Sequence, residues 1–61
     1  MNENELRQWI MFCKFMVSRD SFTVSDLQIS MKLDVARALG LIHEAIEFGM
    51  IRLDGVRYIV Q

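Results

Sequence analysis

The sequence has no proline, a single cysteine, a single histidine and only three glycines. One cysteine excludes an internal disulfide, and Cys13 with His43 supply too few ligands for a structural zinc site. The apolar stretch from Trp9 to Cys13 is far shorter than the roughly 20 residues that a membrane-spanning helix needs. The N-terminus is polar and acidic, unlike a signal peptide. We therefore expect a domain without cofactor or membrane span, in a reducing compartment such as the cytoplasm.

An excess of charge of either sign is also missing. Seven basic and eight acidic residues give a net charge of −1, which provides no general attraction to nucleic acid. Any nucleic-acid role therefore requires a local basic surface. We expect residues 1–61 to form one domain, which buries only about 60% of the surface that its unfolded form exposes. Because 52% of the residues are apolar, some apolar surface should remain exposed.

Apolar residues recur at three- and four-residue spacing through the first part of the chain, which is typical of an amphipathic helix. The pattern predicts a helix over about residues 4–18. Its expected inner stripe consists of Leu6, Trp9, Ile10, Cys13, Met16 and Val17. We therefore expect Trp9 in the core and Cys13 as a buried, inert thiol.

A short β-prone segment predicts a strand over residues 22–24. The next residues, Ser25-Asp26-Leu27-Gln28, have the spacing of a capping box with Ser25 as the N-cap. This motif predicts a second helix over residues 25–31.

Asp34 is a favourable N-cap for a third helix over residues 35–49. Gly49 suits the C′ position, where a helix commonly ends. The inner face of this helix is expected to consist of Val35, Leu39, Ile42, Ala45, Ile46 and Gly49.

Asp54-Gly55 lies between two β-prone runs and predicts a hairpin over residues 50–60 with a two-residue loop. That loop places Arg52 directly opposite Arg57. Like charges in such a pair are unfavourable, and an anion beside them would relieve the repulsion. Both arginines are therefore candidates for binding a phosphate or a partner's carboxylate, the alternative being that they splay into water.

The predicted elements give a mostly α fold with a small β-hairpin, an α+β class, in the order helix, strand, helix, helix, strand, strand. This order resembles a winged helix-turn-helix over nearly the whole chain. Residues 23–51 are also similar to the gamma domain of FtsK-type DNA translocases. The matching positions are Val24-Ser25, Gln28, Lys32-Leu33, Arg37-Ala38, Ile42 and Gly49 followed by two apolar residues. The resemblance implies DNA reading by polar and basic residues early in the third helix, which fits Arg37, although Ala36 and Gly40 stand where that family tends to have polar side chains.

The helix over residues 35–49 is therefore the candidate recognition helix, whose N-terminal part would enter the major groove. Ala36 and Gly40 would allow a close approach, Arg37 could bond a guanine edge, and His43 lies on the same outward face. Lys32, in the turn before this helix, is placed for a phosphate contact. The alternative is an ordinary solvated surface of mixed charge.

The first helix carries a second apolar face, formed by Met11, Phe12 and Phe15, almost opposite the predicted inner stripe. An apolar face that remains exposed on a small domain marks an interface, and a homodimer is its simplest form. The alternative is that Phe12 or Phe15 packs under the N-terminus or the hairpin.

Two hypotheses of function follow. The first is a protein that binds double-stranded DNA, such as a small phage or bacterial transcriptional regulator or a recombination or replication accessory factor. The second is a winged-helix module that binds other proteins. No catalytic constellation stands out and so small a domain has little room for a closed pocket, so we expect neither an enzyme nor a small-molecule substrate.

Overall fold

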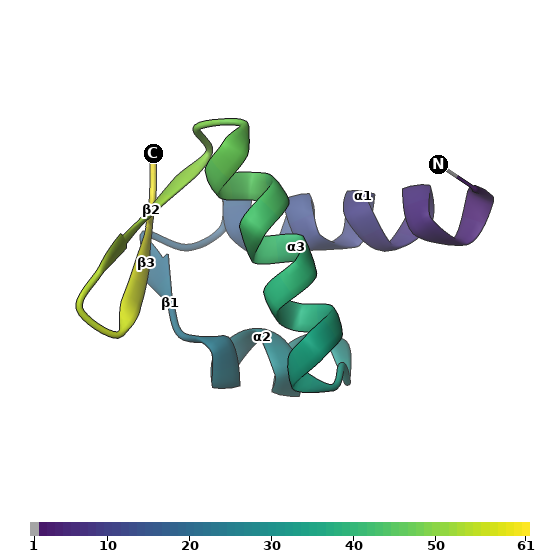
Figure 1. The fold of residues 1–61 in the computed structure, drawn as a ribbon, viewed down its shortest axis with the longest axis horizontal. Helices are drawn as coiled ribbons and strands as arrows, with labels where there is room; N and C mark the ends of the chain where they lie inside the picture. The colour runs from purple at the N-terminus through teal and green to yellow at the C-terminus, as the bar shows by residue number, and fades with distance from the viewer. Residues whose placement is uncertain (1) are drawn as a thin grey trace.

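The computed structural model describes residues 2–61, which form three helices and one three-stranded antiparallel sheet. The elements are α1 (Glu3–Val17), β1 (Ser21–Phe22), α2 (Val24–Met31), α3 (Val35–Glu47), β2 (Ile51–Asp54) and β3 (Arg57–Val60). Figure 1 shows α3 crossing in front of α1, with α2 at its lower end and the β2–β3 hairpin on the side away from the N-terminus. The predicted α+β class and order of elements are confirmed.

Helix α1 is rotated relative to its predicted orientation. Its buried residues are Phe12, Phe15 and Met16, whereas Leu6 and Ile10 of the predicted inner stripe are exposed. Both sides of the helix are apolar, and the side with two phenylalanines removes more apolar area from water when it is buried. The predicted inner face of α1 is therefore wrong except at Met16 and at the half-buried residues between the two sides.

Because of the same rotation, the interface predicted on this helix is wrong. Phe12 has no exposed surface and Phe15 is buried in the core, so neither can belong to an exposed apolar face. Met11 alone of the three is exposed. Trp9 packs against the edge of the core, with its ring 5.6 Å from that of Phe12.

The first strand and the second helix begin earlier than predicted. Strand β1 covers Ser21–Phe22 rather than 22–24, because Thr23 leaves the strand to cap α2. The Thr23 hydroxyl accepts a hydrogen bond from the Asp26 N–H at 3.1 Å, and the Asp26 carboxylate accepts one from the Thr23 N–H at 3.0 Å. This is a complete capping box, two residues before the predicted one at Ser25.

The turn between α2 and α3 is tight and left-handed. Lys32 has φ 54° and ψ 50°, and the Leu33 N–H donates to the Gln28 carbonyl at 3.1 Å. Asp34 then caps α3 by accepting a hydrogen bond from the Arg37 N–H at 2.7 Å, as predicted. The turn fixes how α3 is directed away from α2.

Helix α3 ends at Glu47, two residues before the predicted end. The Met50 N–H donates to the Ala45 carbonyl at 2.9 Å and the Gly49 N–H to the Ile46 carbonyl at 3.0 Å. This pair of bonds is a Schellman motif, which requires a left-handed residue at C′. Gly49, with φ +73°, occupies that position as predicted.

The hairpin has a different register from the predicted one. Its loop is Gly55-Val56 rather than Asp54-Gly55, so Asp54 instead of Leu53 is the last residue before the loop and lies opposite Arg57. Gly55 has φ +65° whereas Val56 has a negative φ. A type II′ turn requires glycine at the first loop position only, which accounts for the shift by one residue on each strand. The predicted direct pairing of Arg52 with Arg57 is therefore wrong.

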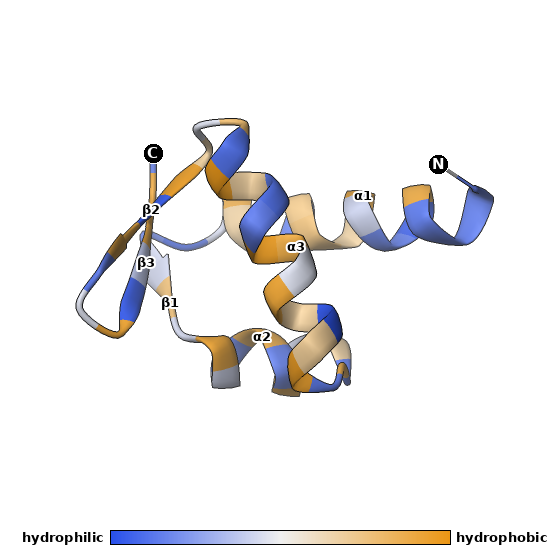
Figure 2. Ribbon diagram, in the orientation of Figure 1, coloured by the Kyte–Doolittle hydropathy of each residue, from blue (hydrophilic) through white to orange (hydrophobic). Residues whose placement is uncertain are grey.

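The core lies between the three helices and one face of the sheet, in which β3 is the central strand. Phe22 of β1 has no exposed surface and its ring lies 6.2 Å from Phe12, 5.2 Å from Phe15 and 5.6 Å from Tyr58. Figure 2 shows hydrophobic residues, in orange, on all three helices and on the hairpin, and several of the large ones are exposed. The described part of the chain therefore buries only part of its apolar content.

The capping box can be tested by substitution. Thr23→Ala should lower the free energy of unfolding by about 1 kcal/mol because it removes an N-cap. Ser25→Ala should change it by less than about 0.5 kcal/mol, the range typical of exposed positions. Urea denaturation followed by circular dichroism measures both, and Thr23→Ser should restore most of the loss. A larger loss for Ser25→Ala than for Thr23→Ala would contradict the assigned cap.

Candidate nucleic-acid interface

The outer face of α3 consists of small and polar residues. Ala36, Gly40 and His43 are all exposed and lie on the side of the helix opposite the buried Ala38 and Ala45. A Cβ atom added to Gly40 would meet no atom within 4 Å. The centre of this face is therefore open and carries no bulky side chain.

Arg37 lies at the flank of that face rather than at its centre. Its Nε donates a hydrogen bond to the Gln8 Oε1 of α1. The hollow beside it, between α1 and α3, is also lined by Gly40, Glu5 and Glu44. Two carboxylates therefore share this flank with the guanidinium, and Arg37 must leave Gln8 to reach a ligand in front of α3.

The two arginines of the hairpin share one face of the sheet. Arg52 lies opposite Ile59 and Arg57 opposite Asp54, and alternation along the strands directs both arginines away from the core. The Arg57 Nε donates to the Ser21 hydroxyl at 3.0 Å. The repulsion inferred from direct pairing is absent, and Arg57 faces a cross-strand carboxylate instead.

Arg19, which the sequence reasoning did not single out, lies close enough to Asp26 to act on its carboxyl group, as Arg57 does. Its guanidinium is stacked 4.1 Å from the centroid of the Phe15 ring, and its Nη2 lies 3.5 Å from the Ser30 hydroxyl of α2. The hydrogen bond from the Thr23 backbone lowers the pKa of Asp26, and the charges of Arg57 and Arg19 lower it further. The sequence around Arg19 does not indicate this arrangement, because Ser30 and Asp26 come close to Arg19 only in the folded chain.

The cationic residues therefore lie at separate places. Arg37 borders α1, Arg57 and Arg19 border Asp26 of α2, and Lys32 projects from the turn between α2 and α3. The predicted set does not form one continuous basic surface, since Arg37 is bonded to α1 and Arg57 to β1. The candidate surface that remains is the outer face of α3, with single cations at its flanks.

The single histidine and the single cysteine lie apart from this face or at its edge. Within residues 2–61, no three histidine, cysteine or acidic side chains are grouped closely enough to hold a metal ion. His43 is exposed beside Ile46 and Glu47 in a shallow hollow. Cys13 is half-buried, and this burial raises the pKa of its thiol. No helix in the described part of the chain has the length and hydrophobicity needed to cross a membrane.

No family model matches the sequence, and neither the curated proteins nor the solved structures include a significant match.

The left-handed Lys32 gives a direct test of the turn. Because an L-residue in this conformation costs about 1 kcal/mol that glycine does not, Lys32→Gly should raise the free energy of unfolding by about that amount. Lys32→Ala keeps the Cβ atom and should give no such gain. Urea denaturation of the two variants provides the comparison, and a loss of stability in Lys32→Gly would rule out strain at this residue.

Proposed function

We propose that this chain is a winged helix-turn-helix domain that binds double-stranded DNA through the outer face of α3. Support comes from the arrangement of elements: α2, the Lys32 turn and α3 have the order of a helix-turn-helix, and the β2–β3 hairpin follows α3 as a wing would. Strand β1 pairs with β3, which attaches the hairpin to the helical part. In such domains the third helix enters the major groove.

The observation that carries the proposal is Gly40. A glycine inside a helix destabilises it by roughly 0.5–1 kcal/mol relative to alanine. Gly40 lies in the middle of α3, has no positive φ and has free space where a Cβ would be. The fold therefore gains nothing from glycine here. A helix surface without a side chain does allow another molecule, such as the edges of base pairs, to approach the backbone closely.

The flanking residues would then have distinct roles. His43 lies on the outer face with Gly40, and Arg37 reaches base edges once it releases Gln8. Lys32, at the start of this face, contacts a phosphate. Arg52 and Arg57 on the outer face of the sheet contact phosphates beside the groove. These contacts come from separate elements, so each adds independently to a weak electrostatic affinity.

The acidic residues of α3 define the orientation of the helix. Glu44 and Glu47 lie in its last turns and are exposed. Phosphates repel them, so the C-terminal half of α3 must point out of the groove while Ala36 and Gly40 enter it. With a net charge of −1, binding should be weak and strongly salt-dependent.

A second candidate function, a module that binds other proteins, is supported by the dispersion of the cations. Arg57 faces Asp54 and borders Asp26, and Arg37 shares its flank with Glu44. Under this reading the open face of α3 receives a protein surface instead of a base edge. The two functions differ in whether the folded domain binds a duplex at low salt.

Gly40 tests the role of α3. Gly40→Glu should weaken binding of a fluorescently labelled duplex at least tenfold in anisotropy titrations at low salt, because it places a bulky anion on the contact face. Gly40→Ala should raise the free energy of unfolding by roughly 0.5–1 kcal/mol and weaken binding less.

Ile29→Glu is the matched control, because Ile29 is 78% exposed on α2 and the substitution adds the same charge elsewhere. It should reduce affinity much less than Gly40→Glu. Equal affinity of Gly40→Glu and wild type would remove α3 from the interface, and a wild type that binds no duplex at low salt would favour the protein-binding function.

The hairpin arginines can be tested through salt dependence. If Arg52 and Arg57 each neutralise one phosphate, replacing both with alanine should reduce the slope of log affinity against log salt by about 1.8. Arg7→Ala serves as the control because Arg7 pairs with Glu3 at 3.1 Å on α1, away from the hairpin. An unchanged slope in the double variant would exclude the hairpin from the contact.

A further inference from the structure

Strand β2 has a neighbouring strand on one side only. Strand β3 lies between β1 and β2, so β2 forms an edge of the sheet. Figure 1 shows β2 as the outermost strand, on the side away from β1 and α2. Arg52, Leu53 and Asp54, three of its four residues, are exposed. Such an edge offers backbone N–H and C=O groups with which another strand can pair.

The register of the hairpin shows which backbone groups face this open edge. The Gln61 N–H donates to the Met50 carbonyl at 3.0 Å, so the carbonyl of Met50 points towards the C-terminal strand. In an antiparallel pair the direction of the backbone groups alternates from residue to residue. The N–H and C=O groups of Arg52 and Asp54 therefore also point towards β3. Those of Leu53, between them, point to the open edge.

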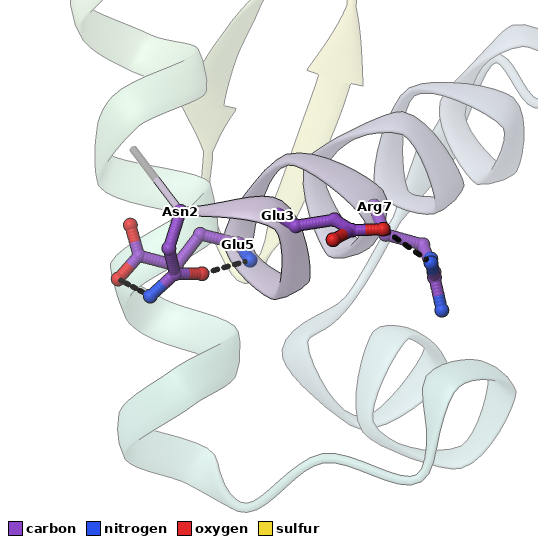
Figure 3. A network of polar contacts seen from close by, with 4 residues as sticks. All are labelled: Asn2, Glu3, Glu5 and Arg7. Carbon is purple, nitrogen blue, oxygen red and sulfur yellow. Dashed lines mark hydrogen bonds and ion pairs between the residues drawn. The ribbon is translucent and has the colours of Figure 1, made fainter.

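Two opposite charges stand on the outer face of β2, one on each side of Leu53. Alternation along the strand places the side chains of Arg52 and Asp54 on the same face of the sheet. Within residues 2–61 the charged side chains form one ion pair, that of Glu3 with Arg7 on α1 at 3.1 Å (Figure 3). In this part of the chain, Arg52 and Asp54 therefore take part in no ion pair and can meet charges on another molecule.

Antiparallel pairing of two β2 strands brings these charges together. When Leu53 lies opposite Leu53 of the other copy, Arg52 of each copy lies opposite Asp54 of the other. Opposite charges in directly opposed positions stabilise a pair of strands. The two ion pairs, and the two backbone hydrogen bonds between the Leu53 residues, are related by a two-fold axis. Two-fold contacts of this kind are the commonest in homodimers.

The neighbouring registers lack this charge complementarity. Only residues whose backbone groups face the edge can bond across it, so the register changes in steps of two residues. With Ile51 opposite Leu53, Arg52 lies opposite Arg52 of the other copy. With Ile51 opposite Ile51, Arg52 faces the uncharged Met50, and a shift in the other direction sets Asp54 opposite Asp54. The charges therefore select the register centred on Leu53.

The other face of the paired strands buries apolar surface. Leu53 lies on the same side of β2 as the buried Ile51, but it extends beyond the core and is 57% exposed. In the centred register it packs against Leu53 of the other copy. Charged residues on an edge strand ordinarily prevent further pairing. On β2 the two charges have opposite signs and are complementary to a second copy of the same strand.

We propose that this chain forms a homodimer in which the β2 strands of two copies pair antiparallel about Leu53. The two sheets then become one continuous sheet. This interface uses none of Met11, Phe12 and Phe15, from which a dimer was predicted. It does not depend on the proposed DNA function.

Sedimentation equilibrium of the isolated chain over a wide concentration range tests the dimer. The apparent mass should rise from 7.2 kDa towards twice that value. Leu53→Pro removes the N–H that faces the edge and leaves the hydrogen bonds between β2 and β3 in place, so this variant should fold and stay monomeric. Leu53→Ala keeps the N–H and should still dimerise, although more weakly. A wild type that stays at the monomer mass at the highest concentration would overturn the proposal, as would a folded Leu53→Pro that dimerises with wild-type affinity.

Charge exchange tests the register and keeps the proposal falsifiable if Leu53→Pro fails to fold. Arg52→Asp sets acidic residues opposite each other, and Asp54→Arg does the same with basic residues. Each should weaken self-association at least about fivefold, the loss of two exposed ion pairs of about 0.5 kcal/mol each. An equal mixture of the two variants should form heterodimers with about wild-type affinity, because opposite charges again face each other.

The control for these variants is Arg7→Asp, the same substitution on α1, which should dimerise as the wild type does. Circular dichroism verifies that each variant is folded. A folded Asp54→Arg that dimerises with wild-type affinity would overturn the register, because Asp54 faces Arg52 of the other copy only when Leu53 is at the centre. A mixture that forms no heterodimer would contradict the ion pairs.

The dimer and the DNA function can fail separately. Both use Arg52, so self-association is measured in the absence of DNA. Gly40→Glu should dimerise as the wild type does, because Gly40 lies on α3 and not on the β2 edge. A wild type that dimerises but binds no duplex would contradict only the proposed function. A wild type that binds a duplex but stays monomeric would overturn only the dimer.

Discussion

The fold depends on the burial of Phe22. This residue lies on a strand of only two residues, too short for its backbone hydrogen bonds alone to hold it in place, yet its side chain is fully buried. Its ring contacts Phe12 and Phe15 of α1 and stacks on Tyr58 of the central strand. One aromatic side chain thereby joins the first helix to the sheet. It also decides which face of α1 is turned inward, and consequently which apolar face remains exposed.

The parts of the fold that were predicted correctly are those set by local residues. The order of elements follows from hydrophobic periodicity, from Asp34 as a cap and from Gly49 as a terminator, each of which acts within one helical turn. The rotation of α1 was not predictable in this way. Both of its sides are apolar, and the choice between them is made by Phe22, which follows the helix in sequence and contacts it only in the folded chain.

The hairpin follows the same rule: its presence was predicted from local residues, but its strand register was not. The Asp54-Gly55 pair correctly predicted that a hairpin turn lies here. The sequence pattern does not distinguish a loop with a positive φ at both positions from one with a positive φ at the first position only, and these two loops give different registers. The observed register sets Asp54 opposite Arg57. The candidate site changed accordingly, because the two arginines no longer face each other: Arg57 lies opposite a carboxylate and Arg52 opposite Ile59. The open surface at Gly40 became the stronger sign of a ligand, because it costs stability that the fold does not recover.

The weak charge of the domain limits how its surface can bind an anionic ligand. A single copy with a net charge of −1 and dispersed cations has few phosphate contacts to offer. Under the proposed function the electrostatic contribution to binding is therefore small, and affinity depends mainly on how closely a ligand approaches the open backbone at Gly40. The single cations at the flanks then position the ligand rather than supply most of the binding free energy.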